Sequence, residues 1–371
     1  MSETYPGQER FVAPLDETPL RAIDAVDVDA VPESQWREAW KRLRSSVLFW
    51  LAVLILAVIA VMIAFPTLFT DANPEAGSLS NSYAPASKGH PFGFTEQGYD
   101  VWARTIYGAR ASVAVGVLAT IFTVLIGMLT GAIAGFYGGW IDTIVSRLSD
   151  IFFSIPLLLA CIVVISVINN VFPDRGFWGS VLVVVLALAL FAWPQVTRQM
   201  RGAVLEVKNL EFVDAATAIG ASKLTNLRRH IVPNALSPVI VTATIMLGVF
   251  IVSESALSFL GLGLPQGIVS WGNDLSAAQN LVRSGQHLTV MWVPATALAV
   301  TVLGFVLLGE AVREGARPEG EEEVSTDRMS AQPLLEIKNL KVGFRAGKEL
   351  PDRRRRREPD DLSRSDDRDR R

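Results

Sequence analysis

The sequence predicts an all-α polytopic membrane protein with six transmembrane helices. Half of the 371 residues are hydrophobic and only 19% are charged. The hydrophobic residues are gathered into uncharged runs of roughly 20 residues, the length that a helix needs to cross a bilayer. A soluble domain of this size rarely contains such runs. The chain's only cysteine, Cys161, lies inside one of them, so the sequence offers no disulfide framework.

Residues 1–35 are polar and acidic, and they are predicted to form a disordered cytoplasmic arm. We expect no cleavable signal peptide, because the first apolar run starts too late in the chain. Trp36 and Trp40 then lie four residues apart on one face of a predicted helical turn, with basic residues along another face. Tryptophan favours the membrane interface, so this turn is expected to lie beside the first span.

The predicted transmembrane domain covers residues 36–317. Its six spans are expected at about 47–69, 112–136, 151–168, 179–196, 237–262 and 289–308. Residues 137–150 are predicted to be a short hydrophilic turn, and Pro156 lies near the start of the third span. A polar loop, residues 198–236, separates the fourth and fifth spans.

The second span carries Gly127, Gly131 and Gly135 at four-residue spacing. Such a stripe of small residues lets another helix approach closely in lipid. It is interpreted as a packing face, either within the subunit or against a partner. The alternative is that lipid-facing glycines are tolerated there by chance.

The polar loop is predicted to contain two short helices. Asn209 is expected to cap the first helix, and Gly220 can end it in the left-handed conformation. Ser222 is expected to cap the second helix and Pro233 to stop it. The bend between them, with its small side chains, suits a groove on a soluble partner. The alternative is an ordinary amphipathic loop between spans.

The same loop carries Asp214-Ala215-Ala216, then Gly220, then Ile231-Val232-Pro233-Asn234. This pattern resembles the cytoplasmic coupling loop of permease subunits of binding-protein-dependent ABC importers. Asp214 stands where the family usually has glutamate. The residues around the pattern look most like the dipeptide and oligopeptide branch, and within it the C-type member of the permease pair.

Other segments extend this resemblance from about His90 to about Arg317. They are His90–Gly93, Ile106–Arg110, Glu254–Gly263, Ser270–Gly272 and Gly309–Glu314. The resemblance implies the type I ABC importer permease fold. It also implies a cell-membrane subunit that forms, with a second permease, a translocation pathway for peptides.

The resemblance further implies particular partners and site residues. Two ABC ATPase subunits would use ATP-Mg, an extracytoplasmic solute-binding protein would deliver the solute, and this chain would be no enzyme and would bind no cofactor, metal or nucleic acid. Docking of the ATPase is assigned to Asp214, Ala215, Ala216 and Gly220. His230, Pro233 and Asn234 are expected to hold the loop against the spans.

Two single polar residues, outside these motifs, are also candidates for a functional role. Glu254 lies within the fifth span, where a carboxylate is costly unless it faces protein or water, so it is a candidate pathway or helix-locking residue. A merely hydrated or hydrogen-bonded carboxylate is the alternative. His90 is a poor metal-ligand candidate, because no second ligand stands near it and a structural loop explains it better.

The distribution of basic residues predicts the orientation. With the N-terminus inside, six spans place both termini and the 198–236 loop in the cytoplasm. Lysine and arginine are then concentrated in the inside segments, as the positive-inside rule requires.

Residues 318–371 are predicted to be a disordered charged tail. Leu334–Phe344 looks like the first strand of an ABC ATPase domain, but no phosphate-binding loop follows it. The tail is interpreted as a remnant of, or a fusion into, a neighbouring ATPase gene whose reading frame is lost. A solvated tail with a chance strand-like patch is the alternative.

Three other functions stay open at this stage. The same machinery could carry nickel or another small solute. An ion-coupled secondary transporter would instead need intramembrane charged pairs and two matched halves. A membrane scaffold without transport would not require the compact loop pattern.

Overall fold

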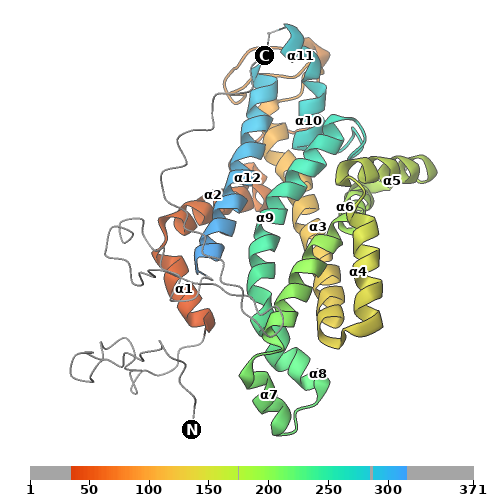
Figure 1. The fold of residues 1–371 in the computed structure, drawn as a ribbon. Helices are drawn as coiled ribbons and strands as arrows, with labels where there is room; N and C mark the ends of the chain where they lie inside the picture. The colour runs from red at the N-terminus through yellow and green to blue at the C-terminus, as the bar shows by residue number, and fades with distance from the viewer. Residues whose placement is uncertain (1–34, 174, 285–286, 316–371) are drawn as a thin grey trace, which may run out of the picture. The chain divides into compact units, whose positions relative to one another are not determined.

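The computed structural model describes residues 35–173, 175–284 and 287–315, and these residues form helices joined by loops (Figure 1). Two isolated bridges, and no named strand, occur within these ranges. The predicted arm before residue 35 and the predicted tail after residue 317 lie outside the described residues.

The helices follow one another along the chain, and the longest connection between described helices, residues 65–100, joins α2 to α3. They are α1 (Gln35–Ser45), α2 (Val47–Ala64), α3 (Val101–Tyr137), α4 (Gly139–Phe153), α5 (Leu157–Val171), α6 (Gly176–Val207), α7 (Glu211–Ala218), α8 (Lys223–Asn226), α9 (Val232–Phe259), α10 (Trp271–Ala277), α11 (Gln279–Ser284) and α12 (Thr289–Gly315). A π-helical turn, Leu227–Ile231, joins α8 to α9. Short 3-10 helices stand at Pro66–Leu68 and Leu79–Asn81.

Among the described residues, five helical stretches are long and apolar enough to cross a membrane: α2, α3, α6, the continuous stretch 223–259 and α12. The pair α4 and α5 passes the same test jointly, although it is bent by 84°. Counting the pair as one span gives up to six, so the predicted all-α polytopic class is confirmed.

The region of the third span differs from the prediction. Residues 137–150 were expected to be a hydrophilic turn, but α4 occupies most of them. The turn is made by Gly138 and Gly139 alone, both at positive φ, and Asp142 then favours the first turn of α4. The predicted span 151–168 is interrupted before Pro156, because proline lacks an N–H and disfavours helix in the residue before it.

The glycine stripe of α3 packs against α6. A Cβ on Gly131 would lie 2.5 Å from the carbonyl oxygen of Thr197, and one on Gly127 would lie 2.5 Å from the Cβ of Val196. A Cβ on Gly135 would likewise lie 2.9 Å from the carbonyl oxygen of Arg201. The two long helices therefore meet backbone to backbone, and the stripe serves packing within this chain.

Candidate functional site

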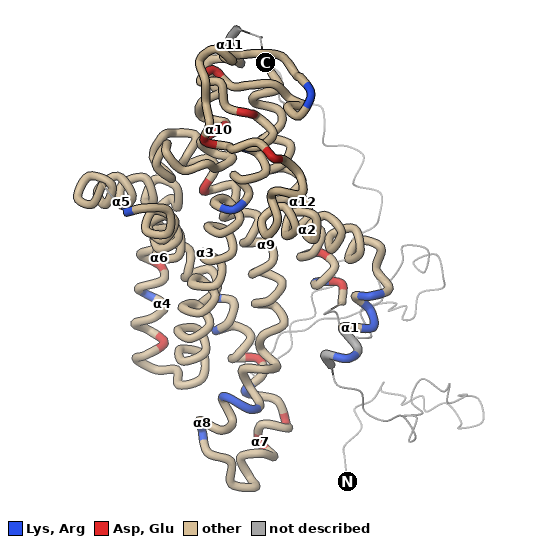
Figure 2. Tube along the Cα trace, turned by 180° about the vertical axis from the view of Figure 1, so that it is seen from behind, with Lys and Arg blue, Asp and Glu red and all other residues tan. Residues whose placement is uncertain are grey.

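Helices α7 and α8 protrude together at one end of the helical bundle, which we call the loop end (Figure 1). Figure 2 shows the same projection from behind. The opposite end, called the cap end, carries α10, α11 and the loops after α2. The residues that the sequence assigns to coupling all lie at the loop end.

Helix α7 begins without the predicted cap. Its first residue follows Leu210, and the Asn209 amide instead donates to the carbonyl oxygen of Leu205 at 2.9 Å. Asn209 still belongs to the end of α6, where its side chain satisfies a free carbonyl, so it is not available to α7. Glu211 and Asp214 in the first turn of α7 favour the helix start electrostatically.

The end of α7 is a Schellman motif centred on Gly220. The N–H of Gly220 bonds to the carbonyl of Thr217, and the N–H of Ala221 bonds to the carbonyl of Ala216, each at 3.0 Å. Gly220 has a φ of +97°, so the predicted left-handed conformation is confirmed. No atom lies within 4 Å of a Cβ built on Gly220, so a side chain would have room there. Glycine is needed at this position because of its backbone conformation.

Hydrogen bonds between side chains hold α7 against α8. Ser222 caps α8 as predicted, because its hydroxyl accepts from the N–H of Thr225 at 3.3 Å. The buried Asn226 amide donates to the Thr217 hydroxyl at 2.8 Å, and this hydroxyl donates to the Val213 carbonyl at 2.8 Å. The two short helices therefore form one unit.

Pro233 does not stop the second helix, contrary to the prediction. It lies in the first turn of α9, directly after the π-helical turn Leu227–Ile231. A wider turn at this point provides a break in the regular hydrogen-bond ladder, into which proline fits without ending the helix. The Asn234 amide donates to the carbonyl of His230 at 2.6 Å across this junction. His230, Pro233 and Asn234 thus sit where the loop enters α9.

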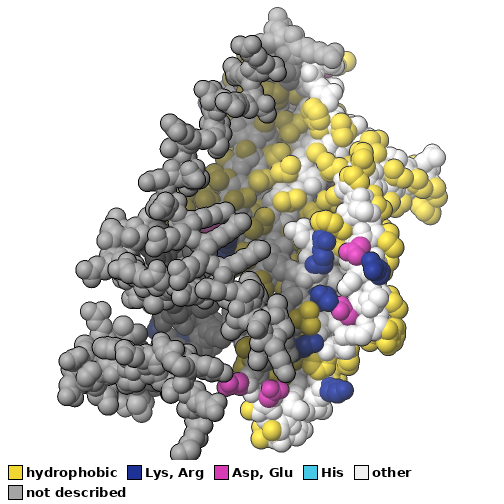
Figure 3. All heavy atoms as spheres, in the orientation of Figure 1, with side chains coloured by type: hydrophobic (Ala, Val, Ile, Leu, Met, Phe, Trp, Pro, Cys, Tyr) yellow, Lys and Arg dark blue, Asp and Glu magenta, His cyan; other side chains and the backbone are white. Residues whose placement is uncertain are grey.

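The free surface of the unit combines acidic, small and apolar side chains. Asp214, Ala215 and Gly220 are exposed, whereas Ala216 is buried beneath them. Exposed apolar side chains surround them: Phe212, Leu224 and Ile219, the last 88% exposed. Figure 3 shows acidic and hydrophobic side chains together at this end. An apolar patch next to charge is typical of a protein contact surface.

Polar contacts anchor the base of the loop. The Lys208 ammonium donates to the carbonyl of Gly135 at 2.9 Å, and the Arg201 guanidinium forms a two-pronged ion pair with Asp142. The Arg198 guanidinium lies 3.6 Å from the ring centroid of Phe153. The loop end of α6 is thereby attached to both α3 and α4.

Glu254 lies near the cap end and faces no open space. Its side chain is fully buried, and the hydroxyls of Ser258 and Ser255 donate to it at 2.9 and 3.3 Å. The Ser258 hydroxyl also accepts from the N–H of Leu264 at 3.1 Å, which closes the turn after α9. This arrangement favours a hydrogen-bonded Glu254 that holds the end of α9 in place over a role in the translocation pathway.

Sequence reasoning missed an ion pair at the cap end. The Arg104 guanidinium donates to the Asp274 carboxylate at 2.6 Å, and both side chains are nearly buried. Burial raises the pKa of the Asp274 carboxyl, and the adjacent Arg104 opposes that rise. Trp271 beside them is fully buried, and its indole N–H donates to the carbonyl of Thr105 at 2.8 Å. The pair joins residues 170 positions apart, and no local pattern indicates it.

His90 has a structural partner. Its Nδ1 contacts the carboxylate of Asp100, which in turn accepts from the N–H of Ala103 at 2.9 Å and so caps α3. Within the described residues, no group of three or more histidine, cysteine or acidic side chains is placed to hold a metal ion.

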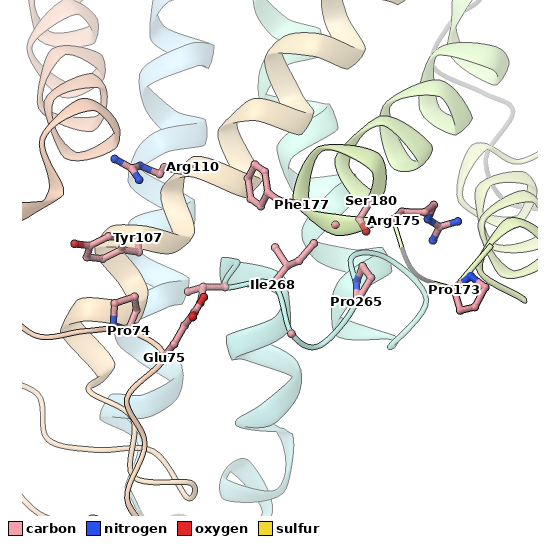
Figure 4. A pocket seen from close by; sticks show the side chains of 13 residues that line it. Pro74, Glu75, Tyr107, Arg110, Pro173, Arg175, Phe177, Ser180, Pro265 and Ile268 are labelled. Atoms are coloured by element: carbon pink, nitrogen blue, oxygen red, sulfur yellow. The ribbon is translucent and has the colours of Figure 1, made fainter.

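A cleft of about 630 Å³ opens at the cap end (Figure 4). Tyr107 and Arg110 of α3 line one side, Arg175 and Phe177 line another, and Glu75 comes from the loop after α2. No sequence pattern indicates this cleft, because its walls come from segments that are far apart in the chain.

Residues 125–315 match the family described as binding-protein-dependent transport system inner membrane component. Residues 34–86 match the N-terminal TM domain of oligopeptide transport permease C.

Three curated relatives match along nearly their whole length. The oligopeptide transport system permease protein OppC of Bacillus subtilis (strain 168) is 33% identical over 298 residues, which cover 80% of this chain and 94% of the relative. The dipeptide transport system permease protein DppC of the same strain is 32% identical over 305 residues, covering 82% and 92%. The glutathione transport system permease protein GsiD of Escherichia coli O6:K15:H31 (strain 536 / UPEC) is 33% identical over 304 residues, covering 81% and 95%.

Proposed function

This chain belongs to the family of binding-protein-dependent transport system inner membrane components and is a permease subunit of an ABC importer, and we propose that the solute it carries is a di- or oligopeptide. The observation that carries the proposal is that both the N-terminal segment and the rest of the chain match peptide permeases. Residues 34–86 match a domain of an oligopeptide permease, and relatives named for oligopeptide and dipeptide transport match about four-fifths of the chain.

Membership of this family sets aside an ion-coupled secondary transporter and a scaffold without transport. Within the family, a different small solute such as nickel is the remaining alternative. One of the relatives is named as a glutathione permease, so chains of similar sequence are named for different solutes. A direct uptake assay with labelled di- and tripeptides, in competition with nickel, separates these alternatives.

The partners belong to the same proposal. A second permease would pair with this chain, two ATPase subunits would bind ATP-Mg and dock on the loop end, and an extracytoplasmic binding protein would supply the solute. The exposed apolar side chains of α5 are compatible with either lipid or a second subunit in the membrane (Figure 3). They include Leu159, Val163 and Val167.

The geometry of the loop end supports its assignment to coupling. Asp214, Ala215 and Gly220 are presented on a unit that hydrogen bonds hold together, and this unit continues into α9 without a break in the helix. A push on α7 would therefore be transmitted as a rigid-body displacement to α9. Such a displacement would shift the equilibrium between the inward-open and outward-open states.

Co-purification tests the docking surface. Asp214→Arg reverses an exposed charge at the centre of the surface, and we expect the tagged chain to keep the second permease but to lose the ATPase subunits in gentle detergent. Mass spectrometry of the co-purifying proteins measures both. Asp71→Arg reverses an equally exposed charge at the cap end and should leave the complex intact. If Asp214→Arg retains the ATPase at the level of the unchanged chain, the coupling assignment is wrong.

A further inference from the structure

A pocket of about 320 Å³ lies where the bent pair α4 and α5 meets α6 and α9. Most of its wall is apolar and aromatic, including Phe152, Phe191 and Phe250. Two polar side chains also line it, Gln195 of α6 and Thr242 of α9. No charged side chain is among the described residues that form the wall.

Gln195 and Thr242 are unusual for residues on membrane-spanning helices. Gln195 is exposed, and neither side chain makes a hydrogen bond to another residue in the described part of the chain. Gln195 precedes Arg201 by six residues, so it lies about 9 Å along α6 from the ion pair at the loop end. Hydrocarbon would satisfy none of the donors and acceptors of an exposed amide, so Gln195 requires water, a polar partner or a polar solute beside it.

The backbone beside the pocket gives an independent indication. Ser154, Ile155 and Pro156 form the break between α4 and α5, and all three are exposed. The Pro156 position supplies no side-chain cap for the start of α5. Irregular backbone at membrane depth is tolerated where it is covered by protein or lines a water-filled cavity. The described residues do not cover the break, so a cavity or other protein must.

We propose that this pocket faces the translocation path and binds the main chain of the transported peptide, an inference that rests on the proposed function. The Gln195 amide offers both a donor and an acceptor for a peptide group, and the Thr242 hydroxyl offers a second contact. The aromatic wall would receive apolar side chains of the solute.

The larger cleft at the cap end is a weaker candidate, because its cations already have partners. The Arg110 guanidinium donates to the carbonyl of Ile63 at 2.8 Å. The Arg175 guanidinium donates to the carbonyl of Ile168 at 3.0 Å and also contacts the Asn169 amide. In the smaller pocket, by contrast, the polar side chains are free to bind.

Thiol labelling of the assembled transporter tests whether the pocket is wet. The buried Cys161, the only cysteine, is first replaced by alanine, and Gln195→Cys is then introduced. The matched control is Leu186→Cys, which is also exposed but lies nine residues, or about two and a half turns, earlier and so on the opposite face of α6. A water-soluble maleimide should label Gln195→Cys about tenfold faster or more, because only a hydrated thiol ionises readily. Equal rates at the two positions would overturn the proposal.

Protection by the solute tests binding. A saturating transported tripeptide should slow labelling of Gln195→Cys, while labelling of Trp140→Cys at the start of α4, where the native side chain is 73% exposed, stays unchanged. A pocket that is labelled quickly but is not protected, in a transporter that imports the tripeptide, would overturn peptide binding and leave the peptide function standing. If the unchanged transporter imports no peptide, the proposed function fails, and the comparison with Leu186→Cys still decides whether the pocket is water-lined.

Uptake kinetics give a second readout. We expect Gln195→Leu to lower peptide uptake about tenfold, the effect of losing one well-formed hydrogen bond, with the ATPase subunits still bound. Gln199→Leu removes the same side chain one turn further along α6, outside the pocket wall, and should transport normally. Unchanged uptake by Gln195→Leu would contradict the assignment.

Discussion

At the scale of single residues, the close approach of α3 to α6 depends on the absence of side chains. Gly127, Gly131 and Gly135 each lie so near α6 that a Cβ would overlap its backbone or a β-carbon. Lipid gives helices no hydrophobic reason to associate, so contact area between backbones has to supply the attraction. One added methyl group at the stripe would therefore separate the two helices along their length.

Gly131→Ala tests this contact. The new Cβ would lie 2.5 Å from the carbonyl oxygen of Thr197, and we expect overpacking to destabilise the fold by about 1–3 kcal/mol. The thermal unfolding midpoint in detergent should fall by several degrees. Gly202→Ala is the matched control, since nothing lies within 4 Å of its added Cβ and alanine favours helix. A midpoint that falls equally in both variants would speak against the close contact.

At the scale of elements, the loop end acts through one backbone conformation. The Schellman motif turns the chain between α7 and α8, and its left-handed residue is Gly220. The hydrogen bonds through Thr217 and Asn226 then hold the two helices at a fixed angle. The surface of the α7–α8 unit therefore keeps its shape only while residue 220 can adopt positive φ.

Gly220→Val should uncouple transport while the chain stays in the membrane. A left-handed conformation costs an L-residue about 1–2 kcal/mol, and more for a β-branched one. We expect ATP-dependent uptake to be largely lost, while the amount of chain in isolated membranes stays the same. Gly220→Asn should retain uptake, because asparagine tolerates the left-handed region. Normal uptake by the valine variant would disprove the role of this turn.

At the scale of the whole molecule, the charges indicate how the described part of the chain lies in the membrane. Basic side chains gather toward the loop end (Figure 2). They include Arg147, Arg198, Lys208, Arg228 and Arg229. The positive-inside rule then predicts that the loop end faces the cytoplasm, which is also where ATPase subunits would dock.

Labelling of whole cells tests this orientation. In the chain without Cys161, a membrane-impermeant maleimide should reach Leu79→Cys at the cap end, where the native side chain is 80% exposed. It should reach Lys223→Cys at the loop end only after the cells are permeabilised. The reverse pattern would show that the chain is inserted the other way round.

Much of the fold could be predicted from the sequence because the signals are local. An uncharged run long enough to cross a bilayer is itself the reason why a span forms, so the polytopic helical class followed from composition and run length. The turn at Gly220 and the cap at Ser222 also depend on neighbouring backbone groups only, and both are present. The cap at Asn209 and the stop at Pro233 were wrong, because a competing carbonyl and a π-helical turn intervened.

The places where the faces of these helices meet depend on three-dimensional packing and could not be predicted from local sequence. The glycine spacing indicated a packing stripe, but its partner α6 is set by the packing of the whole bundle. The same holds for the sharp bend between α4 and α5, the burial of Glu254 and the pair formed by Arg104 and Asp274. Local sequence thus decided which segments are apolar enough to enter the membrane and how the loop of residues 198–236 turns. Contacts between distant segments determined which polar groups are satisfied inside the chain, because burial depends on all the helices at once and not on any one of them.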